Sequence, residues 1–330
     1  MNRPESRPKV FVTRRVPERV LAEVDSRFDM KLYDAEQPLP RAELLAGVRG
    51  QDGVLAMLSE AIDDEFLDAA GPQLRIVANH AVGYDNVDVD ACSRHVVLVS
   101  NTPDVLTAAT AELALTLMLD AVRRVTEGDR MLRARTPWVW TPTFMLGRTL
   151  RGHVLGIVGL GRIGKEVARL AEAFGMEVVY TRRSGADAHV SWEYLDLDEL
   201  VARSDVISIH CPLTPETHHL LDATRLRAMK PTAILVNTSR GPVVDEAALA
   251  DALRSGVIAG AGLDVFEREP EVYEGLLECE NAVLAPHLGS ATDETREAMG
   301  MLCVSALIAV LLEDRVPENA LNPSVAGTVG

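Results

Sequence analysis

Positive charge and paired cysteines are scarce in this sequence, and each shortage argues against a class of function. The 330 residues include 33 lysines and arginines against 49 acidic residues, a formal net charge of −16. A surface of that sign repels phosphate backbones and anionic lipids, so we expect neither nucleic-acid nor membrane binding. The four cysteines, at 92, 211, 279 and 303, show no CxxC spacing and no neighbouring histidine clusters. We therefore predict reduced, mostly buried thiols, with no disulfide framework and no metal site.

Long apolar runs are also missing. The longest, near 303–312, is too short to cross a bilayer, and the opening MNRPESRPKV lacks the apolar segment of a signal peptide. We therefore expect a cytoplasmic protein. What the chain does contain is 47% hydrophobic residues, which is enough for a sizeable core and for two domains of ordinary size.

Short β-rich runs alternate with helix-compatible stretches along most of the chain. Such alternation predicts parallel sheets covered by helices. Between two series of runs, residues 102–125 are apolar on nearly every face, which predicts a helix buried on all sides. The expected strands are 9–13, 52–57, 74–79 and 96–100 in the first series, and 153–159, 177–180, 205–210, 232–237, 258–264 and 281–286 in the second.

The second series has the pattern of a dinucleotide-binding sheet. Near the end, apolar residues recur at helical spacing from Met299 to Val310, and we expect this helix to return to the first domain, followed by a tail at 317–322. The predicted fold is α/β, with two doubly wound parallel-sheet domains. A Rossmann cofactor domain at 102–289 is inserted into a flavodoxin-like substrate-binding domain at 1–101 and 290–330.

A glycine motif, GIVGLGRIG at 156–164, follows a β-rich run and opens a helix-like stretch. Gly159 permits a tight turn, Gly161 lets a pyrophosphate approach the backbone, and Gly164 lets helix and strand pack closely. The helix N-terminus supplies amide groups and a partial positive charge. We therefore predict a dinucleotide site here, with Arg162 and Ile163 in the same loop.

The residue expected to hold the adenosine ribose is normally acidic and lies about twenty positions after the motif. That position is Arg182 in this chain, followed by Arg183 and Ser184. A carboxylate would repel a 2'-phosphate, whereas two arginines and a hydroxyl can bind one. The sequence therefore favours NADP(H) over NAD(H), the alternative being that the arginines are solvated surface charges.

Three segments after the motif carry candidate catalytic groups, each near the carboxyl end of a predicted strand: Arg240, then Asp264 with Glu269, then His287. Open α/β sheets bind their ligands at that edge. These residue types suit reduction of a 2-oxo acid. Arg240 can bind the substrate carboxylate, His287 can donate a proton to the alkoxide, and Glu269 can keep His287 protonated, while the cofactor delivers the hydride. Taken singly, each could be an ordinary surface or loop residue.

The combination of motifs resembles the D-isomer-specific 2-hydroxyacid dehydrogenases, closest to their glyoxylate and hydroxypyruvate reductases. The strings that carry the resemblance are VGYDNVDVDA at 82–91, GIVGLGRIGKEVA at 156–168, the stretch 235–270 from LVNTSRGP to FEREP, and LAPHLGSAT at 284–292. It extends over nearly the whole chain. It implies that Arg240, Glu269 and His287 are the catalytic trio of an NAD(P)-dependent oxidoreductase.

The resemblance also implies binding residues and a homodimer. Asp264 is expected to contact the nicotinamide carboxamide, and Trp140, or alternatively Trp138, to reach the partner's active site. The alternative, given equal weight, is that these tryptophans pack at the interface and have no role in the active site. The other expected cofactor-binding residues are Cys211, Pro212 and Thr238, and the expected substrate-binding residues are Leu58, Ser59, Val82, Gly83 and Arg240.

Two departures and two alternatives stay open. Ala108 stands where these reductases commonly have aspartate, and His80, beside the substrate loop, either tunes substrate choice or is simply packed or solvated. One alternative is another dehydrogenase of the family, such as the phosphite-oxidising type, against which Val82 argues because those enzymes have lysine there. The other is a non-enzymatic, dinucleotide-sensing corepressor-like protein on the same scaffold.

Overall fold

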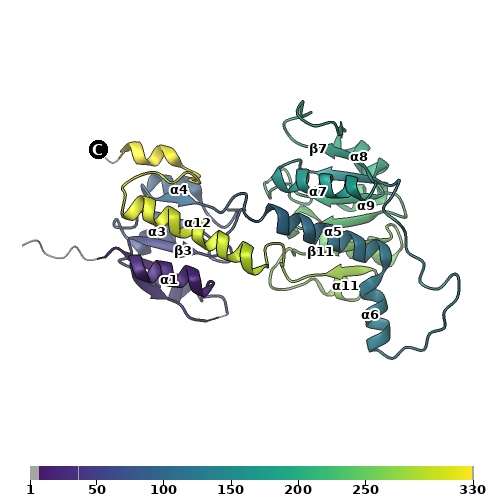
Figure 1. Cartoon of the computed structure of the whole chain (residues 1–330), viewed down its shortest axis with the longest axis horizontal. Coiled ribbons are helices and arrows are strands. Elements are labelled where there is room, and N and C mark those ends of the chain that lie inside the picture. Colours follow the sequence, from purple (N-terminus) through teal and green to yellow (C-terminus); the bar gives the residue numbers. More distant parts are fainter. Residues whose placement is uncertain (1–6, 36, 329–330) are drawn as a thin grey trace, which may run out of the picture. The chain divides into compact units, whose positions relative to one another are not determined.

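A computed structural model describes residues 7–35 and 37–328 of the chain (Figure 1). They form two compact units. The first holds the described residues up to Leu106 and from Thr292 onward, and the second is Thr107–Ala291. The boundaries expected from the sequence lie a few residues earlier. Residues 1–6, the start of the segment expected not to be a signal peptide, lie outside the described part. Among the described helices, none combines the length and the hydropathy of a membrane span.

The first unit is built on a five-stranded parallel sheet in the order β2-β1-β3-β4-β5. This is the predicted flavodoxin-like order. The sequence did not reveal β2, whose DMKL segment is exposed or only half-buried. The strands are β1 Lys9–Val12, β2 Asp29–Leu32, β3 Gly53–Ala56, β4 Ile76–Asn79 and β5 Leu98–Ser100, and the helices are α1 Glu18–Arg27, α2 Arg41–Val48, α3 Asp64–Ala70, α4 Val89–Arg94 and α12 Asp293–Leu311.

The last long helix, α12, belongs to the first unit, as predicted. Cys303, Leu307 and Val310 pack in one core with residues of β1, α1 and β4. The segment after it is not a tail, and that expectation was wrong. Asn322 accepts a hydrogen bond from the Val99 amide (2.8 Å) and donates one to the Val97 carbonyl (2.9 Å), so side-chain and backbone bonds fasten the segment to β5.

The second unit has a seven-stranded parallel sheet in the order β12-β11-β10-β9-β6-β7-β8. Counted from β6, this is the doubly wound dinucleotide-binding order, with one strand added at the edge. Its strands are β6 Val154–Val158, β7 Glu177–Thr181, β8 Glu193–Tyr194, β9 Val206–Ile209, β10 Ile234–Asn237, β11 Gly260–Leu263 and β12 Ala282–Leu284. Its helices are α5 Thr107–Arg123, α6 Val125–Arg133, α7 Arg162–Ala173, α8 Leu197–Arg203, α9 Ala223–Ala228, α10 Glu246–Arg254 and α11 Glu274–Leu277, with a 3-10 turn at Gly241–Val243.

Helix α5 corrects a second expectation. Its inner positions are buried, among them Ala111, Ala114 and Met118, but Ala108, Glu112 and Thr116 are exposed. A spacing of four places these three on one face of the helix. The helix is therefore amphipathic rather than buried on all sides, because short or polar residues recur at every fourth position of an otherwise apolar segment.

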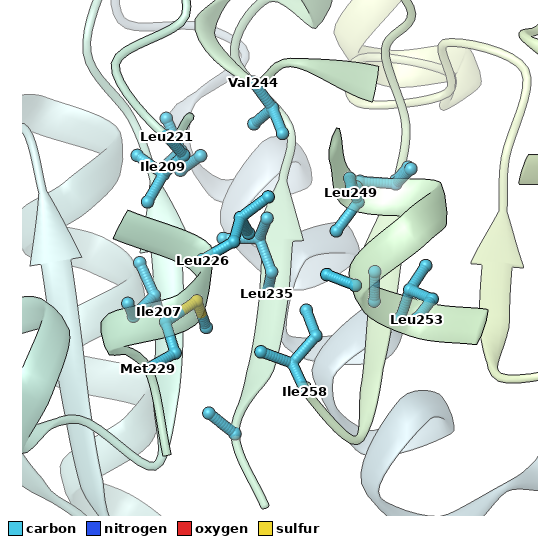
Figure 2. Close-up of a cluster of buried hydrophobic side chains, with 14 of the residues drawn as sticks. Ile207, Ile209, Leu221, Leu226, Met229, Leu235, Val244, Leu249, Leu253 and Ile258 are labelled. Atoms are coloured by element: carbon cyan, nitrogen blue, oxygen red, sulfur yellow. The ribbon is translucent and has the colours of Figure 1, made fainter. Parts of the chain in front are cut away.

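Large aliphatic side chains fill the space between the second sheet and its helices. Figure 2 shows Leu235 of β10 beside Ile207 of β9, with Leu249 and Leu253 of α10 directed toward the same region. Each of these four is at most 3% exposed. Burial of one such side chain contributes about 1.5–3 kcal/mol, so this cluster holds the strand ends that carry the polar residues described next.

Candidate active site

Three neighbouring strands of the second sheet end at the polar segments singled out by sequence. Arg240 follows β10, Glu269 follows β11 and His287 follows β12. The strands pair as β10-β11-β12, all parallel, so their carboxyl ends share one edge. Sheet topology alone thus explains why residues 47 positions apart (287 − 240) meet there.

Glu269 and His287 form a hydrogen-bonded pair. His287 Nδ1 lies 2.7 Å from Glu269 Oε2, and both side chains are 28% exposed, so a small molecule can reach a pair that is partly shielded from water. Burial alone would raise the pKa of Glu269. The hydrogen bond and charge of His287, the Phe266 amide and the charge of Arg240 outweigh it and hold that pKa below its ordinary range.

His287 has a left-handed backbone, with φ of +56°. A residue with a side chain adopts this conformation only when its surroundings fix it. Here the His287 amide donates to the Asp264 carbonyl at 2.9 Å. With Nδ1 engaged by Glu269, Nε2 is the ring nitrogen that can exchange a proton with a substrate.

Asp264 has a role that sequence reasoning missed. Its carboxylate accepts hydrogen bonds from the amides of Leu288 (2.6 Å) and Gly289 (2.8 Å), and the residue is only 1% exposed. Burial raises its pKa. Asp264 therefore fastens the backbone that follows His287. Nothing in the local sequence marks these bonds, because Asp264 follows β11 whereas the two amides follow β12.

Arg240 lies just after β10 and is half-buried. Asn237, at the end of that strand, donates from Nδ2 to the Arg240 carbonyl at 2.9 Å, and Arg240 Nη1 donates to the Ser239 carbonyl at 2.8 Å. These bonds set the backbone and one edge of the guanidinium. The charge of Arg240 also contributes to the lowered pKa of Glu269, so the two groups interact electrostatically.

The glycine loop has the geometry that a dinucleotide needs. A Cβ on Gly159, at φ +99°, would lie 2.6 Å from the Cys211 amide nitrogen, and one on Gly164 would lie 2.4 Å from the Gly159 carbonyl oxygen. A Cβ on Gly161 would meet nothing within 4 Å. Gly161 caps α7 with extended backbone and no side-chain bond, and Arg162 beside it is exposed. The start of α7 is therefore open at Gly161, as the approach of a pyrophosphate to the backbone requires.

Thr238 supports the same interpretation. It follows β10 directly and is 9% exposed, yet its Oγ1 has no hydrogen-bond partner among the residues that the structure describes. A buried hydroxyl without a partner costs about 1–3 kcal/mol. A bound cofactor with polar groups at this edge would satisfy it, so the residues present fit a nicotinamide dinucleotide.

The loop after β7 differs from the simplest expectation. Arg182 is folded back onto its own loop, donating from Nε to the Gly185 carbonyl (2.7 Å) and from Nη1 to the Asp187 carboxylate (3.0 Å). Lys165 Nζ lies 2.9 Å from the same carboxylate. The Lys165 hydrogen bond, the His189 amide and the charge of Arg182 lower the pKa of Asp187 to about 2. Arg183 and Ser184 are exposed, so Arg183 is the better placed of the two arginines to meet a ligand.

The expected substrate residues lie at strand ends of the first unit. Leu58 and Ser59 follow β3, and Val82 and Gly83 follow β4. Both Leu58 and Ser59 are exposed, and Arg14 Nη2 donates a hydrogen bond to Ser59 Oγ at 3.0 Å.

Side-chain amides hold the β4 loop. Asn101 donates to the Val82 carbonyl (2.8 Å) and Asn79 to the Gly83 carbonyl (3.1 Å). With their carbonyls engaged, the backbone of both residues is fixed at the carboxyl edge of the sheet, where it could receive a ligand.

The structure also shows the surroundings of His80, of the two tryptophans and of the four cysteines. His80 is 4% exposed, its Nε2 donates to the Arg296 carbonyl at 3.3 Å, and burial lowers its pKa to about 4, so it is a packed histidine. Trp138 and Trp140 are 52% and 74% exposed on the segment after α6. Cys92, Cys279 and Cys303 are buried and Cys211 is half-buried, all as free thiols, and burial raises the pKa of Cys211 to about 11.

A cavity of about 480 Å³ lies elsewhere in the second unit, among Thr232, Arg254, Asn281 and Val283. Thr232 and Asn281 precede β10 and β12, so the cavity opens at the amino ends of strands whose carboxyl ends carry Arg240 and His287. The cavity is therefore separate from the candidate active site, which is defined by the positions of Arg240, Glu269 and His287.

Known proteins resemble the chain over nearly its full length. Residues 115–289 match the D-isomer specific 2-hydroxyacid dehydrogenase, NAD binding domain. A glyoxylate reductase of Thermococcus litoralis is 44% identical over 97% of this chain and 98% of its own. A crystal structure of a Thermus thermophilus protein has a TM-score of 0.89 at 44% identity, covering 95% of this chain and 99% of that one. The NADPH-dependent glyoxylate/hydroxypyruvate reductase of Sinorhizobium meliloti, in complex with NADP and malonate, has a TM-score of 0.84 at 35% identity, covering 97% and 98%.

Proposed function

The chain belongs to the D-isomer-specific 2-hydroxyacid dehydrogenase family, and we propose that it reduces glyoxylate, hydroxypyruvate or a similar small 2-oxo acid with NADPH. Membership of this family makes the chain an NAD(P)-dependent oxidoreductase. The single observation that carries the proposal is the Glu269–His287 pair at 2.7 Å, on the same sheet edge as Arg240. The similarity to glyoxylate reductases supports the substrate class.

Each member of the trio has one task in this proposal. Arg240 binds the substrate carboxylate and polarises the 2-oxo group. His287 gives the Nε2 proton to the oxygen that becomes the hydroxyl, and Glu269, bound to Nδ1, stabilises the charged imidazole before the transfer. When bound, the reduced nicotinamide supplies the hydride. Asp264 keeps the His287 loop in place through Leu288 and Gly289, and Thr238 offers its hydroxyl to the cofactor.

The preference for NADPH is supported by the charges after β7. Arg182 and Arg183 of this loop and Lys165 of α7 outnumber Asp187 and Glu216, the carboxylates that interact with them, so the net charge here is positive and a 2'-phosphate is favoured over a bare hydroxyl. We assign the contact to Arg183 and Ser184, because Arg182 is engaged by Asp187. The first amides of α7, at Arg162 and Ile163, receive the pyrophosphate, while Cys211 and Pro212 line the cofactor site.

The first unit is proposed to bind the substrate, through the backbone of Val82 and Gly83 and beside Leu58 and Ser59. A second copy of the chain is proposed to cover the segment after α6, where Val139 and Trp140 are 75% and 74% exposed. Apolar side chains this exposed commonly mark an interface. Of the two exposed tryptophans, we propose that Trp140 reaches the partner's site. Analytical ultracentrifugation tests the dimer: the native protein should sediment with twice the mass of a single chain, and Trp140→Ala or Val139→Asp should sediment with the mass of one chain.

The activity is tested by mixing the protein with glyoxylate, hydroxypyruvate, pyruvate or a bulkier 2-oxo acid, each with NADPH and with NADH. We expect oxidation of NADPH with the smallest acids and the highest kcat/KM there. Arg240→Ala is expected to lower kcat/KM more than about 100-fold with the Kd for NADPH little changed. Normal turnover by this variant would refute the site, and absence of turnover by the native chain with all acids would favour a dinucleotide-sensing protein.

A further inference from the structure

We infer that His219 is a positioning residue for Glu269, acting through Glu267 on the loop that follows β11. The inference rests on the proposed function, in which Glu269 supports proton transfer by His287. It concerns a histidine that lies on a different loop, between β9 and α9, and that belongs to none of the motifs discussed above.

The backbone of His219 is the first observation. Its φ is +49°, the left-handed region that favours glycine and that His287 also occupies. The His219 amide donates to the Pro242 carbonyl at 2.8 Å, and Leu221 and Val244, two residues further along each segment, form a parallel bridge. His219 is thus held against the segment that follows Arg240, in a conformation that a side chain makes costly by about 1–3 kcal/mol.

The imidazole is the second observation. Its Nε2 lies 3.2 Å from Glu267 Oε1, and its Nδ1 lies 3.9 Å from Asp245 Oδ2. The ring of His218 stacks on it with centroids 4.1 Å apart. The side chains of His219 and Glu267 are 35% and 24% exposed, so water only partly competes for their hydrogen bond. The strained backbone therefore aims the ring at an acidic group.

That acidic group is tied to the start of α10. The Glu246 amide donates to Glu267 Oε1 at 3.0 Å, and the Glu267 amide donates to Glu246 Oε1 at 2.8 Å. Burial raises the pKa of Glu246, and the nearby charge of Arg268 opposes this. Three carboxylates, of Asp245, Glu246 and Glu267, gather here, and His219 is a donor that faces two of them. Loss of the imidazole would leave their mutual repulsion less compensated.

The loop cannot shift at Glu267 without moving Glu269. The Phe266 amide donates to Glu269 Oε1 at 2.9 Å, so the backbone beside Glu267 fixes the carboxylate that binds His287. On the other side, a Cβ on Gly241 would lie 1.9 Å from the Phe266 carbonyl carbon. The segment after Arg240 therefore touches this loop backbone to backbone. Through Pro242 and Glu267, His219 holds both segments in register.

The test replaces His219 by glycine, which accepts the left-handed backbone without strain, so that only the imidazole is lost. We expect kcat for glyoxylate reduction to fall about 3- to 10-fold, with KM and the Kd for NADPH within about twofold. We also expect the alkaline limb of the kcat–pH profile to move to lower pH, because a misplaced Glu269 stabilises the imidazolium of His287 less. A purely structural role would lower Tm and leave this limb in place.

Matched variants complete the experiment. His218→Ala removes the stacked ring but not the Glu267 contact, and should keep the native kcat and profile. Glu267→Ala should reproduce the effect of His219→Gly, Glu267→Gln should recover most of it, and the double variant H219G/E267A should lose no more than either single one. If His219→Gly does not fold, Glu267→Ala and Glu267→Gln decide the matter by the same readouts.

Failure of the inference is distinct from failure of the proposed function. If Glu269→Gln lowers kcat while His219→Gly and Glu267→Ala keep the native kcat and alkaline limb, His219 does not position Glu269. If Glu269→Gln itself keeps the native kcat, the proposed catalytic pair is wrong, and the inference falls with it.

Discussion

Arg182 donates from Nη1 to Asp187 at 3.0 Å, so the first arginine after β7 is bound within its own loop. We therefore expect the two neighbouring arginines to respond differently to removal. Arg183→Ala should lower kcat/KM for NADPH about 10- to 100-fold and leave that for NADH nearly unchanged, because a charge-assisted bond to phosphate contributes about 1.5–3 kcal/mol.

The matched variant is Arg182→Ala. Because the Arg182 guanidinium binds Gly185 and Asp187, its loss should loosen the loop, lower Tm and weaken both nucleotides together. Steady-state kinetics with NADPH and NADH separate the two outcomes. An Arg182→Ala variant that loses NADPH selectively, beside an unaffected Arg183→Ala, would reverse our assignment.

Glu269→Gln tests the proton-transfer pair. An amide cannot stabilise the imidazolium as a carboxylate does, so kcat for reduction should fall about 10- to 100-fold and its alkaline limb should move to lower pH. The Kd for NADPH, measured by fluorescence titration, should not change. Equal pH profiles of native and variant enzyme would contradict the role of Glu269.

The acid side of the native profile follows from the same pair. The pKa of Glu269 lies below its ordinary 4.5 in the folded chain. A depressed carboxylate pKa means that the interaction is present above the unfolded value and is lost only as pH falls through the folded one. We therefore expect the Glu269–His287 pair to persist at pH 4.5 and to break below it, which chemical shifts of labelled His287 would follow; loss of the pair already above pH 5 would contradict the lowered pKa.

Two glycine substitutions separate folding from cofactor binding. Gly159→Ala forces a Cβ to 2.6 Å from the Cys211 amide at φ +99°, and should destabilise the second unit by about 1–3 kcal/mol. Gly161→Ala meets nothing within 4 Å, so Tm should stay within a degree or two, about what a neutral substitution gives. Its added methyl should nevertheless weaken NADPH at least about tenfold. Unchanged NADPH affinity in Gly161→Ala would argue against a pyrophosphate at this loop.

Ala108→Asp tests the departure at the start of α5. This helix has no acidic residue in its first turn, and Ala108 is exposed there. A carboxylate at that end should stabilise the second unit by about 0.3–1 kcal/mol through the helix dipole. The neutral, similarly shaped Ala108→Asn is the control in thermal unfolding. An equal Tm for both variants would show that the missing aspartate has no such effect.

Much of the fold followed from the sequence because its strands are short apolar runs with helices between them. The regular spacing from Val154 onward indicated the doubly wound sheet, and the apolar residues from Met299 to Val310 indicated a last helix that returns to the first domain. The weak points were segments with mixed composition. Strand β2 is too polar to be recognised from its own residues. The segment 317–322 resembles a tail in the sequence because the bonds that hold it, to Val97 and Val99, join residues more than 200 positions apart and leave no local pattern.

The candidate site, like the fold, could be predicted in part from the sequence. Arg240, Glu269 and His287 were expected at one edge because parallel strands end together. The bonds that hold them were not, since Asp264 reaches Leu288 and Gly289, and Glu267 reaches His219, across loops of irregular shape. Such contacts depend on loop backbone angles, including the left-handed ones at His219 and His287, which no periodicity in the sequence encodes.

The division of the chain has a consequence for its synthesis on the ribosome. Strands β1 to β5 emerge long before α12, whose Leu307 and Val310 belong to the same core as Val10 and Ile76. All residues of the second unit, Thr107–Ala291, emerge between them. The second unit can therefore complete its core first, while the nascent first sheet still exposes apolar surface. During this interval the exposed apolar surface makes the growing chain prone to aggregation.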